Sequence, residues 1–166
     1  MKTTTFLLGI VLAFFMVSCG PTTDDAIKHN DKIVLDQKEI IDAQNLFLTS
    51  MIDAKDSESV SQAFENYLEI LTEKEKKYTE IGKFDEKDSF RIAMQTYIDQ
   101  MISITENEYK NLVEIYNKDI EDVSQSDRDN WEKIAKDATG KESQANDAFL
   151  EAQKRFAKEY HFELKE

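Results

Sequence analysis

The sequence is poor in the residues that interrupt regular secondary structure. Among its 166 residues there are four glycines and a single proline, Pro21. The short strands of an all-β domain need frequent turns, and turns depend on glycine and proline. Their shortage over so long a chain favours long helices.

Cysteine and histidine are also scarce, which narrows the chemistry available to the chain. Cys19 is the only cysteine, so no disulfide bond can form within one molecule. Di-iron helical bundles use Glu-x-x-His pairs, but Ala26 and Lys158 stand three residues before His29 and His161. We therefore expect both histidines at the surface, and neither a resident metal nor another cofactor.

The acidic stretch 119–129 is the one feature that suggests calcium binding. An EF-hand loop needs a glycine at its sharp turn and a closing glutamate. Counted from Asp122, these two positions hold Asp127 and Lys133. We expect a solvated turn here, with loose surface binding of calcium as the alternative.

Catalytic motifs are missing from the sequence: it has no Ser–His–acid set, glycine-rich phosphate loop or basic aromatic patch. Glu108 falls within an otherwise apolar helix face, where it is either a buried acid or an edge residue that reaches water. Trp131 and five tyrosines are interpreted as core residues, with a ligand groove as the alternative. These tyrosines are Tyr67, Tyr78, Tyr97, Tyr109 and Tyr116. We name no catalytic residue and predict that the protein is not an enzyme.

The one long apolar run, Phe6–Val17, follows Lys2 and precedes Ser18 and Cys19. It is shorter than the ~20 residues that span a bilayer, and a positive start before a short apolar core is typical of an export signal. The residues Met16-Val17-Ser18-Cys19 resemble the lipobox of bacterial lipoproteins, in which the thiol receives a diacylglyceryl group before cleavage. We therefore expect Cys19 to become the lipidated first residue. The alternative is a chance cysteine in an ordinary signal.

This interpretation divides the chain into a signal peptide (1–18), a lipidated tether (19–26) and a helical domain (27–166). The position after the cysteine is not aspartate, which favours the outer membrane over retention at the inner membrane. Asp24 and Asp25 resemble the acidic export signals of Bacteroidota lipoproteins, with a plain flexible tether ending in helix-capping acids as the alternative. We expect an outer-membrane lipoprotein on the cell surface or on the periplasmic face.

Acidic residues outnumber basic ones by 34 to 21, which gives a net charge of −13. Lys2 leaves with the signal, so 20 basic residues remain against 34 acidic ones and the net charge becomes −14. A charge this negative argues against binding to nucleic acid and against lying flat on anionic lipid.

Four segments carry apolar residues at helical spacing. They cover residues 24–54, 57–81, 85 to 117 or 120, and 127–160. Four such helices with short connections predict an all-α protein, an antiparallel up-down-up-down four-helix bundle. A single long coiled coil is the alternative, and the turn signals near residues 55, 84 and 123 argue against it.

Local signals refine these helices. Gly140 lies within the fourth segment, but the apolar face keeps the same phase on both sides, so we predict one continuous helix with Gly140 facing outward. Asp56 is expected to cap the second segment and Gly82 to end it. The alternating residues 160–164 are expected to dock as an extended tail or a last turn.

Near the start of the predicted domain stand Asn30-Asp31, Ile33-Val34 and Gln37, and near its end stand Ala148-Phe149, Ala152-Gln153, Phe156-Ala157, Tyr160 and Phe162. Both groups of residues resemble a family of small bacterial surface lipoproteins of the Bacteroidota type, which has no assigned activity. His29 stands where that family usually has tyrosine. The resemblance implies a helical fold and a lipid anchor, and it carries over no site residues.

Together these features predict a membrane-anchored surface or envelope lipoprotein with a non-enzymatic interaction or structural role. Its expected partners are the membrane, through the lipid on Cys19, and an unknown protein or small molecule. The rival hypothesis is a carrier that holds a small hydrophobic or cationic ligand between its helices.

Overall fold

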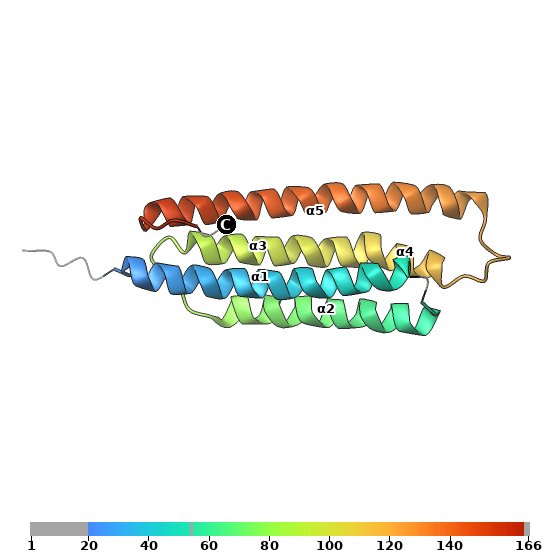
Figure 1. The fold of residues 1–166 in the computed structure, drawn as a ribbon, viewed down its shortest axis with the longest axis horizontal. Helices are drawn as coiled ribbons and strands as arrows, with labels where there is room; N and C mark the ends of the chain where they lie inside the picture. Colours follow the sequence, from blue (N-terminus) through green and yellow to red (C-terminus); the bar gives the residue numbers. More distant parts are fainter. Residues whose placement is uncertain (1–19, 54, 165–166) are drawn as a thin grey trace, which may run out of the picture.

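The computed structural model describes residues 20–53 and 55–164, and every regular element in this part of the chain is helical. The elements are α1 (Thr23–Ile52), α2 (Ser57–Glu80), α3 (Ser89–Ile104), the π-helix η1 (Thr105–Tyr109), α4 (Lys110–Tyr116) and α5 (Gln125–Glu159). Because α3, η1 and α4 follow one another without a break, they form one rod. Four antiparallel rods pack side by side (Figure 1). The prediction of an all-α four-helix bundle is confirmed.

Side-chain caps fix where three of the helices begin. Thr22 and Asp25 form a capping box at the start of α1, and Ser124 and Asp127 form another at the start of α5. Asp56 caps α2 as predicted, since its carboxylate accepts a hydrogen bond from the backbone N–H of Ser59 at 2.9 Å. Residues 23–26, assigned above to the tether, are already helical.

The rod formed by α3, η1 and α4 begins later than predicted. Helix α3 starts at Ser89, and residues 81–88 form a connection, so the expected start near Asp85 is wrong. Asp88 adopts a left-handed conformation with φ 54°, which aspartate tolerates better than most residues. Its carboxylate accepts hydrogen bonds from the backbone N–H of Phe84 at 3.3 Å and from Arg91 Nε at 2.5 Å. These bonds hold the connection in place of a helical turn.

Helix α5 passes through Gly140 without interruption, as predicted. Gly140 is exposed, and no atom would lie within 4 Å of a Cβ added there. At its C-terminus the chain turns at His161, whose φ is 58°, and the backbone N–H of Phe162 bonds the carbonyl of Ala157 at 3.0 Å. The tail then folds back against α5, where the ring centroids of Phe162 and Phe156 lie 6.1 Å apart. The predicted docking of residues 160–164 is therefore confirmed.

The π-helix explains the polar exception in the apolar face of the third rod. A π-turn inserts one extra residue into the helical repeat, so the phase of the inward face moves by one position. Tyr109 is buried in the place where regular spacing puts Glu108. Glu108 lies at the edge of the face, where its Oε1 accepts a hydrogen bond from Lys141 at 2.7 Å. Its other carboxylate oxygen is buried.

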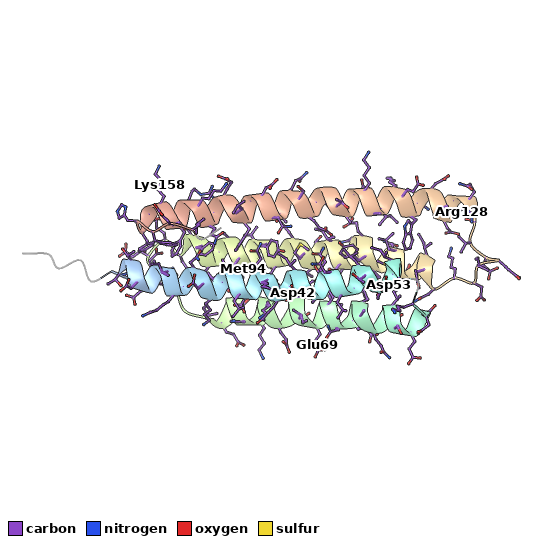
Figure 2. All side chains as sticks on the ribbon, viewed as in Figure 1. Asp42, Asp53, Glu69, Met94, Arg128 and Lys158 are labelled. Atoms are coloured by element: carbon purple, nitrogen blue, oxygen red, sulfur yellow. The ribbon has the colours of Figure 1, made fainter. Side chains whose placement is uncertain are left out.

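The rods define two ends of the molecule. The near end holds the start of α1, the connection 81–88 and residues 160–164; the far end holds the end of α1, the start of α2 and residues 117–124 (Figure 1). Figure 2 shows Asp53 and Arg128 toward the far end, with Lys158 toward the near end. None of the described helices has the length and apolarity needed to cross a membrane.

Candidate functional site

Helices α1 and α5 meet along a polar seam. Their backbones approach each other less closely than those of α3 and α5, and long amide side chains fill the space between them. Asn30 Oδ1 accepts a hydrogen bond from Gln153 Nε2 at 3.0 Å, and Gln37 Nε2 donates to Asn146 Oδ1 at 3.4 Å. Both pairs repeat at intervals of seven residues on antiparallel helices. Because an amide left without its partner is costly in a bundle core, the seam fixes the register of α1 against α5.

The seam ends at a cluster of tyrosines beside Glu142, whose side chain is half-buried. Gln44, seven residues after Gln37, donates from Nε2 to Tyr109 Oη at 2.9 Å. The π-helix η1 brings Tyr109 into this layer. Tyr67 Oη and Tyr97 Oη are buried there without a hydrogen-bond partner within the described residues, as is Glu142 Oε1. We call the group Gln44, Tyr67, Tyr97, Tyr109 and Glu142 the core cluster.

Burial governs the protonation of Glu142. It raises the pKa of this carboxyl from 4.5 to about 7, and Gln44 opposes the shift only in part. The ionisable groups that face it are Tyr97 on α3 and Tyr67 on α2, and neither brings a positive charge. Burial raises the pKa of Tyr97 to about 12 and raises that of Tyr67 as well, so both phenols stay neutral. The core cluster therefore holds one carboxyl that exchanges a proton near neutral pH.

The raised pKa of Glu142 predicts a pH-dependent stability. The folded chain holds a proton on Glu142 between its ordinary pKa of 4.5 and about 7, while the unfolded chain has released it. The free energy of unfolding should therefore fall as the pH rises through this window, and level off above it. Replacing Glu142 by Gln should remove this fall, so the variant gains stability over the wild type at pH 8. Urea unfolding at a series of pH values measures both effects.

A matched control for this experiment is Glu132→Gln, which changes an exposed glutamate of the same helix. It should leave the pH profile of the wild type unchanged. If the Glu142→Gln variant showed the same fall in the free energy of unfolding between pH 5 and pH 7 as the wild type, that fall would belong to another group.

A second buried charge lies between α1 and α2. Asp36, whose side chain is 5 % exposed, accepts hydrogen bonds from Lys74 Nζ at 2.7 Å, Lys77 Nζ at 2.6 Å and Tyr78 Oη at 2.8 Å. Burial alone would raise the pKa of Asp36, but these three hydrogen bonds outweigh it and hold the pKa below its ordinary value. With its oxygens fully occupied by groups of the protein, Asp36 joins two helices.

The histidines differ in their surroundings. His161 is exposed as predicted, but His29 is half-buried, so the prediction of a surface His29 is wrong. Its ring stacks on Phe84 with centroids 4.3 Å apart and lies 5.7 Å from Phe156. The flat apolar faces of an imidazole suit such a site, and burial lowers the pKa of His29. The connection 81–88, unforeseen from the sequence, supplies the stacking partner.

The other candidate residues mainly pack in the core or cap helices. Tyr67, Tyr78, Tyr97 and Tyr109 are buried core residues as predicted, while Trp131 and Tyr116 are half-buried at the far end. In the stretch 119–129, Asp127 caps α5 and binds Lys118 Nζ at 2.7 Å. Within residues 20–53 and 55–164 no three histidine, cysteine or acidic side chains are placed to hold a metal ion. Cys19 lies outside the described residues.

The seam and the core cluster were not recognised from the sequence, although a signal was present. Asn30, Gln37 and Gln44 recur every seven residues beside the apolar face of α1. A polar heptad of this kind indicates a buried polar seam once the neighbouring helix is known. Glu142 gave no such signal, because its surroundings are formed by Gln44 on α1, Tyr67 on α2 and Tyr97 on α3.

Comparison with known proteins adds no relative. No family model, no curated protein and no solved structure matches the chain.

Proposed function

We propose that the protein is a membrane-anchored lipoprotein whose helical bundle stands on the membrane by its near end and serves a non-enzymatic interaction role. The observation that carries this proposal is the small number of residues between Cys19 and the start of the bundle in the sequence. The capping box of α1 begins at Thr22, three residues after Cys19, and Ala26 is already fully buried in the core. A lipid on Cys19 would therefore hold the near end against the membrane, with almost no flexible tether between them.

The length of α1 sets the reach of such a bundle. Its 30 residues, at a rise of about 1.5 Å each, extend roughly 45 Å. A bundle held upright would present its far end at about this distance from the lipid surface. The net charge of −14 that remains after removal of the signal, 20 basic against 34 acidic residues, suits this arrangement, since an acidic bundle is repelled by anionic headgroups.

Asp36 and the amides of the seam support a structural rather than a catalytic role. Asp36 is occupied by three hydrogen-bond donors, and the seam amides pair with one another. Pairing of this kind fixes the positions of helices, whereas a catalytic group must remain open to a substrate.

The experiment that tests the anchor is the variant Cys19→Ala. A cell grown with an alkyne analogue of palmitate should label the wild type and leave the variant unlabelled, because the thioether requires the Cys19 thiol. The variant should also leave the membrane fraction. Ser18→Ala is the matched control, since it keeps a small residue before the cysteine and should keep the label. Label retained in Cys19→Ala would refute the proposed anchor.

A second candidate function is the transport of a small cationic ligand between the helices. The observation that favours it is the core cluster, where Tyr67, Tyr97 and Glu142 have buried polar atoms without a hydrogen-bond partner among the described residues, and the two phenols lie near the Glu142 carboxyl. A ligand cation would neutralise Glu142 and lie against the ring faces. Native mass spectrometry separates the two functions: a carrier should retain a small molecule that is lost in Glu142→Gln.

A further inference from the structure

The far end of the bundle carries an apolar groove. It lies between α4, the connection 117–124 and the first turns of α5, and it encloses about 290 Å³. Its lining residues are Ile115, Val123, Arg128, Trp131 and Glu132. Pockets that enclose drug-sized ligands have volumes of about 300–1,000 Å³. This open groove is therefore suited to one large side chain of a docked polypeptide.

The two most exposed large apolar side chains of the described residues lie at the same end. Ile120 is 89 % exposed and Ile52 is 82 % exposed, and these are the two highest values for large apolar residues in the described part of the chain. Ile120 stands three residues before Val123 in the connection that forms one wall of the groove. An exposed apolar side chain three residues from the wall of the groove adds to the apolar surface on which a partner can dock.

The charge around the groove is strongly negative. Residues 49–60 and 112–133 contain ten acidic side chains against four basic ones, a local net charge of −6. Of the basic ones, Lys118 is engaged by Asp127 at 2.7 Å. The exposed acids of the connection, Asp119, Glu121 and Asp122, take part in no ion pair that the structure describes. Their uncompensated charge attracts a positively charged partner and repels a second copy of this acidic chain.

We propose that the far end is a docking surface for a segment of a partner protein in which basic residues flank one large apolar side chain. The apolar side chain enters the groove beside Val123 and Trp131, and the flanking cations face the acids of the connection 117–124. This inference rests on the proposed function, since anchoring by Cys19 is what turns the far end away from the membrane and toward a partner.

Trp131 supplies the measurement, because it is the only tryptophan of the chain and it lines the groove. The full-length protein is kept in a non-ionic detergent and titrated with a synthetic nonapeptide of lysine and serine that carries one central leucine. A second peptide replaces the leucine by serine at unchanged charge. The fluorescence of Trp131 should shift with the leucine peptide, which should bind at least tenfold more tightly than the serine peptide.

Variants locate the binding site. Val123→Ser and Ile120→Ser should each weaken binding of the leucine peptide several-fold, and Glu121→Lys should weaken binding of both peptides. Ile120 is almost fully exposed, so its replacement removes little packing and leaves the fold intact even where Val123→Ser does not. Leu35→Ser, which changes another exposed apolar residue far from the groove, is the matched control and should bind as the wild type does.

Three outcomes would overturn the inference: equal affinity for the two peptides, which shows attraction by charge alone; unchanged affinity in Ile120→Ser and Val123→Ser; or no binding at millimolar peptide. The titration does not depend on acylation. If the Cys19→Ala experiments show that the chain is not lipidated but the chain still binds the leucine peptide, the groove proposal stands and the anchor proposal fails. If the chain is lipidated but does not bind the peptide, the anchor proposal stands and the groove proposal fails.

Discussion

Replacing Phe149 by Ala should lower the free energy of unfolding by about 3–5 kcal/mol, a large part of the roughly 5–15 kcal/mol by which a domain of this size is stable. Phe149 is 2 % exposed, and its ring lies 5.4 Å from that of Phe90 and 5.5 Å from that of Tyr97. Its neighbours on the same face of α5, Ala145 and Ala152, have no side chain long enough to fill the space left behind. The cavity therefore persists in the variant.

Gly140→Ala is the matched substitution on the same helix. Gly140 is exposed, has no left-handed backbone conformation and leaves open space for a methyl group. Alanine favours a helix over glycine by ~1 kcal/mol, so this variant should be neutral or more stable. Urea midpoints of the two variants compare them directly. A loss in Gly140→Ala comparable with that in Phe149→Ala would contradict a continuous α5.

Removing the carboxylate of Asp36 should have the second largest effect. Taking one partner out of a buried ion pair costs about 3–5 kcal/mol, because the other charge stays buried and unpaired. In Asp36→Ala the ammonium of Lys74, whose side chain is 12 % exposed, keeps only Glu39, and the Tyr78 hydroxyl loses its acceptor. The remaining contact with Glu39 places the expected loss near the lower limit of this range.

The matched control for Asp36 is Asp42→Ala, which removes an exposed carboxylate of the same helix that pairs with exposed Lys38. Exposed pairs contribute about 0–1 kcal/mol, so this loss should be small. The pH dependence provides a second measurement. Because the pKa of Asp36 is lower in the folded chain, its contribution is present at neutral pH and is lost as the pH falls through that pKa. The gap between wild type and Asp36→Ala should therefore narrow in acid, and equal losses for the two variants at neutral pH would contradict the role of Asp36.

The sequence predicted the helices where local signals and the apolar repeat agree. Asp56 caps α2 as expected, and the unbroken phase around Gly140 correctly indicated one long α5. In both cases the information lies within a few residues along the chain. The lipidation of Cys19 stays a prediction, since that residue lies outside the described part of the structure.

Features that depend on two helices at once were not predictable in this way. The π-turn at Thr105–Tyr109 shifts the inward face by one residue, which a repeat of fixed period cannot show. His29 is half-buried against Phe84 of the connection 81–88, and Glu142 is half-buried beside Gln44 of α1, Tyr67 of α2 and Tyr97 of α3. Both environments depend on residues distant in the sequence, since Phe84 lies 55 positions from His29 and Gln44 lies 98 positions from Glu142.

The seam between α1 and α5 gives the bundle a mechanical property. Its amides recur every seven residues on both helices, so the hydrogen bonds form only in particular registers of α1 against α5. Sliding by less than a full repeat separates Asn30 from Gln153 and Gln37 from Asn146. A full repeat is a movement of roughly 10.5 Å along the axis. It would also pull His29 off Phe84 at the near end. Sliding of α1 along α5 therefore breaks contacts in the seam and at the near end together, so the two helices resist displacement along their common axis.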